Sequence, residues 1–331
     1  MNELRYTQFV GTGGIGTGIL FELDSDRLLA RNETRLARLS PAKDYCKQHI
    51  ILHYLARTLT PEARIIPIGR LGCDAAGDRL LRQMADAGMD VRFVEQTTER
   101  STMYCVCLQY PDKAVCNVTT SESACDLVDE SFIEAALAQI TLDAQTLVVA
   151  VPEVPVAART SLLRRAGEAG AYRVSSCLVD EFDEFIGQGG LMNTDLLVIN
   201  ENEAAACCGK QFAEMRDLAK TCLERLQREN ADIRLLMTCG AQGSWVCEGE
   251  RLRHLPAIAT QVVATGGAGD ACTAGTICGL ALGLPFLPED DRLSAPELGA
   301  RFAAEAIRDA DTISERIDRA MMMKTIAERK Q

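Results

Sequence analysis

The chain has 331 residues, of which 47% are hydrophobic and 25% charged, a composition typical of a soluble globular protein with a large core of its own. Its 47 acidic and 35 basic residues give a net charge of −12, which argues against nucleic acid and against an anionic membrane surface as partners. An anionic small molecule stays compatible with this charge, because backbone amides, a metal ion or single basic residues can hold it.

Cysteine usage and the N-terminal sequence indicate a cytoplasmic protein. The 14 cysteines include no C-x-x-C pair, which favours reduced thiols over a disulfide scaffold. The N-terminus, MNELRYTQFV, has neither the basic nor the apolar segment of a secretory signal. Residues 271–288 are uncharged but contain glycine, threonine and proline, so a buried helix is expected there rather than a membrane span.

The first part of the chain is predicted to alternate between strands and helices. We expect strands at residues 5–10, 19–23 and 63–68, and helices at residues 43–59 and 75–87. The first strand runs into the glycine-rich sequence GTGGIGTG, and Gly88 closes the second helix. No repeat or linker separates these elements from the rest, so a single domain over residues 1–331 is expected.

A small β-lid is expected next. Strand-like runs occur at residues 91–94, 102–108 and 114–119. The turn signal YPDK at residues 110–113 predicts a hairpin, and the lid is expected to comprise about residues 17–24 and 91–120. Both alternating faces of residues 103–110 are fairly apolar, so both are expected to be covered, which suggests a homodimer formed through the lid.

From about residue 130, helices and strands alternate regularly. Strands are expected at residues 146–151, 172–175, 196–199 and 235–238. Alternation of this kind predicts a mainly parallel sheet with helices on both faces. The expected fold is therefore an α/β fold, a three-layer α/β/α sandwich with a small β-lid.

A glycine turn is the strongest candidate for chemistry. The sequence ATGGAGD at residues 264–270 is followed at once by the small-residue helix ACTAGTICGLALGL. Unpaired N–H groups and the helix dipole at such a turn favour an anion. Asp270 could accept a proton from a hydroxyl nucleophile there. Helix capping by the aspartate explains the same residue equally well.

Two residues that follow the strand at residues 196–199 are candidates for a magnesium site. Asn200 and Glu203 can share one helix face and hold waters of a Mg²⁺ ion, which keeps most of its hydration shell. The same N-x-x-E pattern is an ordinary capping box, and without further context that interpretation is the stronger one.

The strand at residues 235–238 ends in T-x-G-x-x-G. The Thr238 hydroxyl can donate a hydrogen bond to a phosphate, and Gly240 and Gly243 allow a phosphate to approach the backbone closely. A tight turn between two strands is the alternative.

The sequence GTGGIG at residues 11–16 fits the G-x-G-x-x-G pattern and suggests a rival, a nicotinamide-dependent dehydrogenase. That fingerprint requires a helix next, but residues 19–23 favour a strand, and no suitable acidic residue follows at the right distance.

Metal-site patterns are weak. His49 and His53 are spaced like two ligands on one helix face, but the glutamate of zinc hydrolases is missing, which favours packed histidines. Two cysteine pairs lack a matching distant pair and are poor zinc candidates: Cys105/Cys107 and Cys207/Cys208.

Taken in order, these segments resemble the ribokinase-like (PfkB-type) carbohydrate kinases from about residue 6 to about residue 310. IGRLGCDAAG at residues 68–77 looks like the family's G-x-x-G-x-D-x-x-G segment, and MADAGMDV at residues 84–91 is similar to the stretch that leads into its lid strands. Residues 267–270 match the family's G-A-G-D signature at all four positions.

The resemblance implies roles for the candidate residues. Asp270 would be the catalytic base, and an anion hole would be formed by Gly267, Ala268 and Gly269. Asn200 and Glu203 would lie near Mg²⁺, bound through water, and near the triphosphate of ATP. The nucleotide phosphates would be lined by Thr238, Gly240 and Gly243.

The departures from the family lie on the acceptor side. Members typically carry an Asn/Asp pair after the first strand and a glycine pair followed by Asn at the substrate helix. This chain has GGIG at residues 13–16 and SPAKDYCK at residues 40–47 instead. Candidate replacements for acceptor binding are Gly14, Lys43, Asp44, Lys47 and Glu153. The two lysines are expected to share a helix face, which suggests an anionic or phosphorylated acceptor.

A second departure is Ala264, where many members have an Asp that helps to hold a monovalent cation. The resemblance therefore does not extend to potassium activation.

The expected activity is transfer of the γ-phosphoryl group of Mg·ATP to a hydroxyl of a small sugar-like metabolite, with Asp270 as base. Closure of the lid would exclude water as a competing acceptor. Two alternatives stay open. One is a catalytically weakened relative that binds a metabolite as a sensor, and the other is the NAD-dependent oxidoreductase.

Overall fold

A nine-stranded sheet forms the centre of the computed structural model, which describes residues 4–289 and 292–328. The first three residues of the N-terminal sequence discussed above lie outside these ranges. In sheet order, the strands are β14 (Arg251–Leu255), β13 (Ser244–Glu248), β12 (Arg234–Thr238), β11 (Leu196–Asn200), β10 (Tyr172–Ser175), β9 (Thr146–Ala150), β1 (Gln8–Thr12), β5 (Arg64–Gly72) and β6 (Val94–Thr97). Strands β12 to β6 are parallel, and only β13 and β14 are antiparallel, so the predicted mainly parallel sheet is confirmed.

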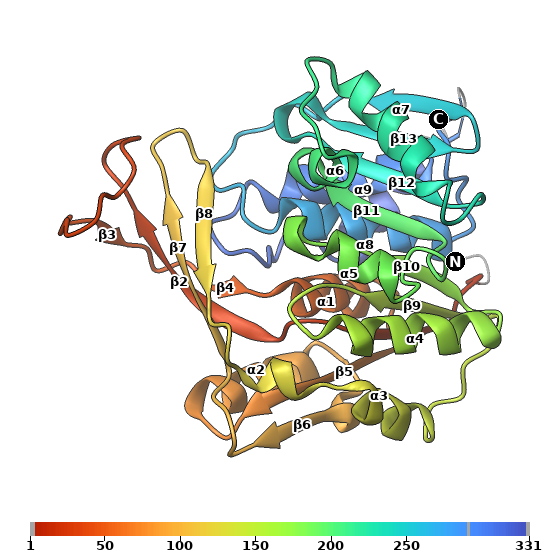
Figure 1. Ribbon diagram of the computed structural model, residues 1–331, viewed down its shortest axis with the longest axis horizontal. Coiled ribbons are helices and arrows are strands. Elements are labelled where there is room, and N and C mark those ends of the chain that lie inside the picture. The colour runs from red at the N-terminus through yellow and green to blue at the C-terminus, as the bar shows by residue number, and fades with distance from the viewer. Residues whose placement is uncertain (1–3, 290–291, 329–331) are drawn as a thin grey trace.

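Helices cover both faces of this sheet because successive strand side chains point to opposite sides. Phe9 belongs to one buried cluster, and its neighbour Val10 belongs to the other. One layer contains α1 (Lys47–Leu59), α2 (Ala75–Asp86), α8 (Ala268–Ala281), α9 (Ala295–Ala306) and α10 (Arg319–Glu328). The other contains α3 (Glu130–Leu137), α4 (Val156–Glu168), α5 (Phe182–Gly187), α6 (Glu201–Cys208) and α7 (Met215–Leu226). The result is the expected three-layer sandwich (Figure 1).

Helix α8 is buried along its length, which explains its small residues. It packs against α9 so closely that a Cβ at Gly279 would lie 2.5 Å from the Cα of Ala295. The apolar composition of α8 therefore serves helix packing. No helix in the described part of the chain is both long and apolar enough to span a membrane.

A second, smaller sheet projects from one side of the layered body (Figure 1). We call it the lid, and it consists of β2 (Gly16–Glu22), β3 (Arg38–Leu39), β4 (Asp44–Tyr45), β7 (Met103–Gln109) and β8 (Val115–Thr119). The expected hairpin is present, since β7 and β8 are antiparallel neighbours, and β2 runs parallel to β7.

The expected lid boundary at residue 91 was wrong. Val91–Phe93 form a single 3₁₀ turn, and β6 pairs in parallel with Gly69–Gly72 of β5. Because β5 continues to Gly72, its last residues can pair with β6. This pairing places β6 in the large sheet rather than in the lid.

The expected helix at residues 43–59 begins only at Lys47. Asp44 and Tyr45 are extended and pair with Gly18 and Thr17 of β2, so the chain enters the helix through a strand of the lid. Lys43 therefore lies outside the helix and does not share a helix face with Lys47.

Candidate active site

The glycine turn before α8 forms the base of the candidate site. Gly267 precedes the helix with φ 77°, and a Cβ there would lie 2.5 Å from the carbonyl oxygen of Thr312. Only glycine combines this positive φ with so little space. The Ala268 N–H donates to the Thr265 carbonyl oxygen at 3.3 Å, whereas the N–H groups of Gly269 and Asp270 have no partner within the helix, at a helix start whose dipole favours an anion.

Asp270 lies in the first turn of α8 and forms an ion pair with Lys47 of α1 at 3.7 Å. Burial raises the pKa of the Asp270 carboxyl, whereas the Lys47 ammonium opposes this rise. In return, the Asp270 carboxylate raises the pKa of Lys47. The ammonium thus favours the charged form of a desolvated carboxylate, although the net pKa of Asp270 stays raised.

Asp270 and Lys47 line a small cavity at the carboxyl ends of the parallel strands. Its volume is about 50 Å³, and it is also lined by Gly269, Ser175, Ser176, Asn200, Glu203, Thr238 and other residues. Asn200 ends β11 and Thr238 ends β12, so adjacent strands deliver both side chains to one place. Ligands of open α/β sheets bind at this edge.

Asn200 and Glu203 form a complete capping box. The Asn200 Oδ1 accepts hydrogen bonds from the N–H groups of Asn202 and Glu203 at 2.9 Å, and Glu203 Oε2 accepts one from Asn200 at 2.8 Å. Glu203 is nevertheless only 6% exposed, and burial raises its pKa. The pair therefore caps α6 and also lines the cavity, so capping does not exclude a role in ligand binding.

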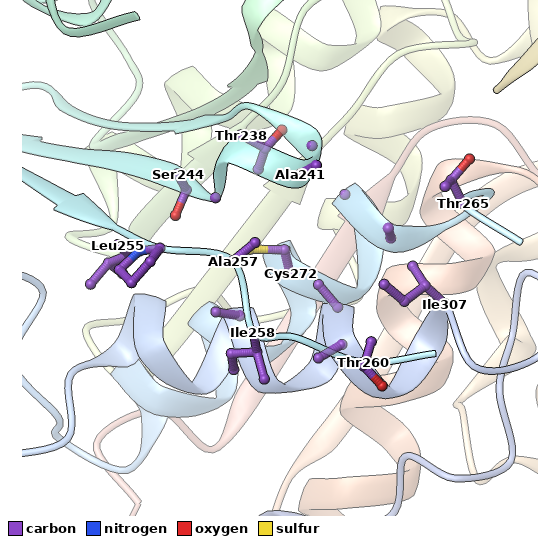
Figure 2. A pocket seen from close by; sticks show the side chains of 18 of the residues that line it. Thr238, Ala241, Ser244, Leu255, Ala257, Ile258, Thr260, Thr265, Cys272 and Ile307 are labelled. Atoms are coloured by element: carbon purple, nitrogen blue, oxygen red, sulfur yellow. The ribbon is translucent and has the colours of Figure 1, made fainter. Parts of the chain in front are cut away.

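A larger cavity of about 540 Å³ adjoins the small one and shares Thr238 and Gly269 with it. Figure 2 shows Thr238 and Ala241 on one side of this cavity and Ile258 and Thr260 on the other. Most of the wall is apolar and comes from residues 255–260, α8 and α9, as suits a flat aromatic base.

Gly243 lets the chain pass the edge of the larger cavity. Its φ is 86°, and a Cβ would collide with the Leu255 carbonyl oxygen and lie 2.7 Å from the Ala257 nitrogen. We expect Gly243→Val to displace residues 255–257 and to weaken nucleotide binding about tenfold or more, measured by calorimetric titration with ATP. Gly249→Val is the control, because Gly249 also has positive φ, 58°, but no atom within 4 Å of its Cβ. Equal ATP affinity in both variants would contradict this assignment of the cavity wall.

Glu153 approaches the site from the loop after β9. It has φ 77°, and a Cβ on Gly14 would collide with its carboxylate, so Gly14 leaves the space that Glu153 occupies. Burial raises the pKa of Glu153 to about 7, against the opposing effect of Lys47. Its Oε2 has no hydrogen-bond partner among the described residues. Glu153 also lines a cavity of about 410 Å³ beneath β7 and β8 of the lid.

The raised pKa of Glu153 makes stability depend on pH. Folding favours the protonated carboxyl, so this contribution is complete below the ordinary pKa of 4.5 and is lost as the pH rises through about 7. We expect Glu153→Gln to match the wild type at pH 4 and to exceed it by roughly 1–3 kcal/mol at pH 8 in denaturant unfolding. If the free energy of unfolding depended on pH identically in the two proteins, the raised pKa of Glu153 would be refuted.

The remaining acceptor-side residues are dispersed. Lys43 is exposed, and its backbone N–H donates a hydrogen bond to Asp311 at 2.9 Å. Asp44 points into the lid, where its carboxylate contacts Cys105 and Cys107. The structure thus brings Lys47, Glu153 and Gly14 together near Asp270 and leaves Lys43 outside.

Sequence reasoning missed two parts of the site. Ser175 and Ser176 line the small cavity, and residues 255–260 form a wall of the larger one. The strand at residues 172–175 is expected from the sequence, and ligands of parallel sheets bind at the carboxyl ends of strands. The position of Ser175 and Ser176 at that end is therefore a sequence signal for the site. Residues 255–260 carry no motif, because their role depends only on where the chain leaves β14.

The rival patterns lack their structural context. The GTGGIG sequence leads from β1 into strand β2 rather than into a helix, as a dinucleotide-binding fingerprint requires. His49 is fully buried, and neither of its ring nitrogens has a hydrogen-bond partner among the described residues. Neither histidine joins a group of three potential metal ligands in the described ranges.

Comparison with known proteins agrees with this architecture. The family model described as pfkB family carbohydrate kinase matches residues 52–317. The chain belongs to this family.

Similar solved structures support the fold of this PfkB-family protein. Ribokinase from Arabidopsis thaliana, complexed with ribose and ATP, is 18% identical, with a TM-score of 0.74, covering 97% of this chain and 99% of that one. Giardia lamblia ribokinase is 16% identical, with a TM-score of 0.79 and coverage of 96% and 99%. Aminoimidazole riboside kinase from Salmonella enterica, complexed with aminoimidazole riboside and an ATP analogue, is 17% identical, with a TM-score of 0.70 and coverage of 96% and 99%. No curated protein sequence matches the chain.

Proposed function

We propose that this PfkB-family protein transfers the γ-phosphoryl group of ATP to a hydroxyl of a small sugar-like metabolite, with Asp270 as general base. One observation carries the proposal: the Asp270 carboxylate, whose side chain is only 15% exposed, lies in the first turn of a helix, where the small cavity adjoins the larger one. Nucleotide complexes of the similar kinases support ATP as the donor.

In the proposed mechanism, the larger cavity holds the nucleoside, and its phosphates extend past Thr238 toward the α8 turn. The N–H groups of Gly267, Ala268 and Gly269 hold the transferring phosphoryl group. Asp270 accepts the proton of the attacking hydroxyl, and the developing alcohol oxygen attacks the γ-phosphorus as the bond to ADP breaks. Lys47 opposes the rise in the Asp270 pKa and so favours the ionised base.

Mg²⁺ is the proposed companion of the triphosphate, and the residues present fit it. The buried Glu203 carboxylate and the Asn200 amide offer oxygen atoms at the small cavity, and both also serve the capping box. They would therefore hold the ion through water, as Mg²⁺ favours. When bound, the ion neutralises phosphate charge.

A neutral acceptor fits the charges around Asp270 better than an anionic one. Lys47 is the only ammonium among the groups that shift the Asp270, Glu153 and Glu203 pKa values, and it faces all three carboxyls. Because Lys43 lies outside the site, no second lysine of the described part of the chain assists Lys47 there. We therefore propose that the acceptor is a polyhydroxylated, uncharged metabolite.

The decisive experiment is an ADP-release screen with Mg·ATP across sugars, nucleosides and phosphosugars. We expect acceptor-dependent ADP release with at least one uncharged sugar or nucleoside. Release with phosphosugars alone would overturn the neutral acceptor, and no release with any acceptor would overturn the kinase.

A second candidate is a metabolite-binding sensor. The Lys47–Asp270 ion pair favours it, because Lys47 engages the carboxylate that would otherwise accept the proton of the hydroxyl. A sensor would bind a sugar without releasing ADP. Calorimetric binding together with the screen above separates the two functions.

Potassium is not proposed as an activator. Ala264 is 7% exposed and offers no side-chain oxygen where many family members have a cation-holding Asp. A titration with KCl is therefore expected to leave ADP release unchanged.

We propose that the protein forms a homodimer through the lid. The face of β7 with Met103, Cys105 and Cys107 is buried. The opposite apolar face, which we call the open face, is only partly covered, since Tyr104 is exposed and Val106 and Leu108 are half-buried, contrary to the expectation that both faces are covered. We also propose a cytoplasmic location, because all 14 cysteines are free, as is typical of proteins of the reducing cytoplasm.

Val118 on β8 is 75% exposed on the open face of the lid. We expect Val118→Lys to shift the protein from dimer to monomer in sedimentation-velocity experiments, because an ammonium would be buried in an apolar interface. Met192→Lys is the control, since Met192 is 64% exposed outside the lid. A monomeric wild type would contradict the proposal.

A further inference from the structure

Three potential metal ligands meet on the inner face of the lid, and none of them lines the small or the larger cavity. The Asp44 Oδ2 lies 2.7 Å from the Cys105 Sγ and 3.3 Å from the Cys107 Sγ, and the two sulfur atoms are 3.7 Å apart. In the described ranges, these residues form the only group of three His, Cys, Asp or Glu side chains close enough to share an ion.

Strand pairing creates this cluster. Cys105 and Cys107 are two residues apart on β7 and therefore face the same side of the sheet. Gly18 of β2 pairs with Cys105 on one side and with Asp44 on the other. A Cβ on Gly18 would collide with the Cys105 sulfur and lie 2.7 Å from the Asp44 Oδ2, so the glycine leaves the space in which the ligands meet.

Both thiols of the cluster are buried, Asp44 is half-buried, and no side-chain cation among the described residues balances the charge of the carboxylate. Both cysteines are 4% exposed, and Leu20 packs against them. Asp44 has no lysine, arginine or histidine within ion-pair distance in the described part of the chain, and both thiols donate to it instead. A carboxylate beside two thiols in an apolar setting is a donor set that a thiophilic cation satisfies.

We propose that Asp44, Cys105 and Cys107 bind one divalent cation of the zinc class. Two thiolates at about 2.3 Å from a tetrahedral zinc ion lie about 3.8 Å apart, close to the sulfur separation in the cluster. The mixed sulfur and oxygen set favours zinc over Mg²⁺ or Ca²⁺, which take oxygen ligands. The fourth position is left to water, as in zinc sites with three protein ligands.

Charge and protons balance when the cation binds. Each thiol releases its proton to solvent as its sulfur binds the ion. Before binding, one carboxylate gives the cluster a charge of −1. Afterwards one carboxylate, two thiolates and a divalent cation again sum to −1. The cation therefore enters without adding net charge to a buried place.

The ion would join β7 to the segment that leads into Lys47. Asp44 is the first residue of β4, and Lys47 begins α1 three residues later. Metal binding would thus fix the lid against the start of that helix. The proposal rests on the three ligands alone and does not depend on kinase activity.

The test uses the full-length, reduced and metal-free protein titrated with Co²⁺, a spectroscopic substitute for zinc. We expect a thiolate-to-cobalt charge-transfer band, displaced by Zn²⁺ and unaffected by excess Mg²⁺. Cys105→Ser, Cys107→Ser and Asp44→Asn should each weaken binding about tenfold or more. Cys116→Ser is the matched control, because Cys116 is an exposed lid cysteine outside the cluster and should leave the band unchanged.

A second measurement needs no variant. With Zn²⁺ present, alkylation followed by peptide mass mapping should show Cys105 and Cys107 protected while Cys116 still reacts. A cobalt band that persists in both cysteine variants, the absence of a band in the folded wild type, or a Cys105–Cys107 disulfide under reducing conditions would overturn the proposal.

Discussion

Asp270→Asn is expected to reduce acceptor-dependent ADP release by about 10²–10⁴-fold while ATP still binds. Asparagine has nearly the same size and leaves the glycine turn intact, but its amide cannot take up the hydroxyl proton. Asp270 lines the small cavity but not the larger one, and the two cavities share only Gly269 and Thr238, so nucleotide binding should persist. Turnover is measured by coupled ADP release, and ATP affinity is measured by calorimetry.

Asp217→Asn provides the control for this experiment. Asp217 is an exposed aspartate in the first turn of α7, and it lines none of the cavities described above. Its variant should retain full turnover. Near-normal turnover by Asp270→Asn would exclude Asp270 as the base, whereas loss of ATP binding would place its carboxylate in the nucleotide site instead.

Lys47→Met is expected to move the acidic limb of the pH–rate profile upward by about 1 unit or more. Burial already raises the pKa of Asp270, and Lys47 is the first group that opposes the rise. Without the ammonium, Asp270 holds its proton to higher pH. Because the base must be ionised to act, activity is lost first at low pH and recovers as the pH rises. The profile of kcat/KM from pH 5 to 9 measures this shift.

Lys43→Met is the matched control, since Lys43 is a lysine on the same segment but is exposed. Its profile should coincide with that of the wild type. A uniform loss of activity at every pH in Lys47→Met would instead indicate that Lys47 binds the acceptor. Circular dichroism checks the fold, because removing one partner of a buried ion pair destabilises a protein by about 3–5 kcal/mol.

Local patterns were sufficient to predict much of the layered body. The strand expected at residues 146–151 is β9 (Thr146–Ala150), because a strand that is buried on both faces forms a continuous apolar run that the sequence shows. The helix after the glycine turn was predicted for a similar reason, since glycines followed by an apolar segment indicate a helix start. Both features depend on residues close together in the chain.

The parts that were not predicted depend on distant residues. The start of the helix expected at residue 43 moved to Lys47 because Asp44 and Tyr45 pair with β2, and no nearby residue indicates that pairing. Similarly, β6 joins the large sheet because β5 is long enough to receive it. A single sequence shows an extended segment, but it does not show which edge that segment will pair with.

The sequence by itself determined the family, the α/β class and the position of the glycine turn before α8, because each follows from short-range spacing. Only the tertiary structure decided which charges meet. It paired Lys47 with Asp270, excluded Lys43, and placed the Asp44 carboxylate against two lid thiols. The physical reason is that electrostatic and coordination chemistry depend on separations of a few ångströms in space, which the packing of remote segments sets.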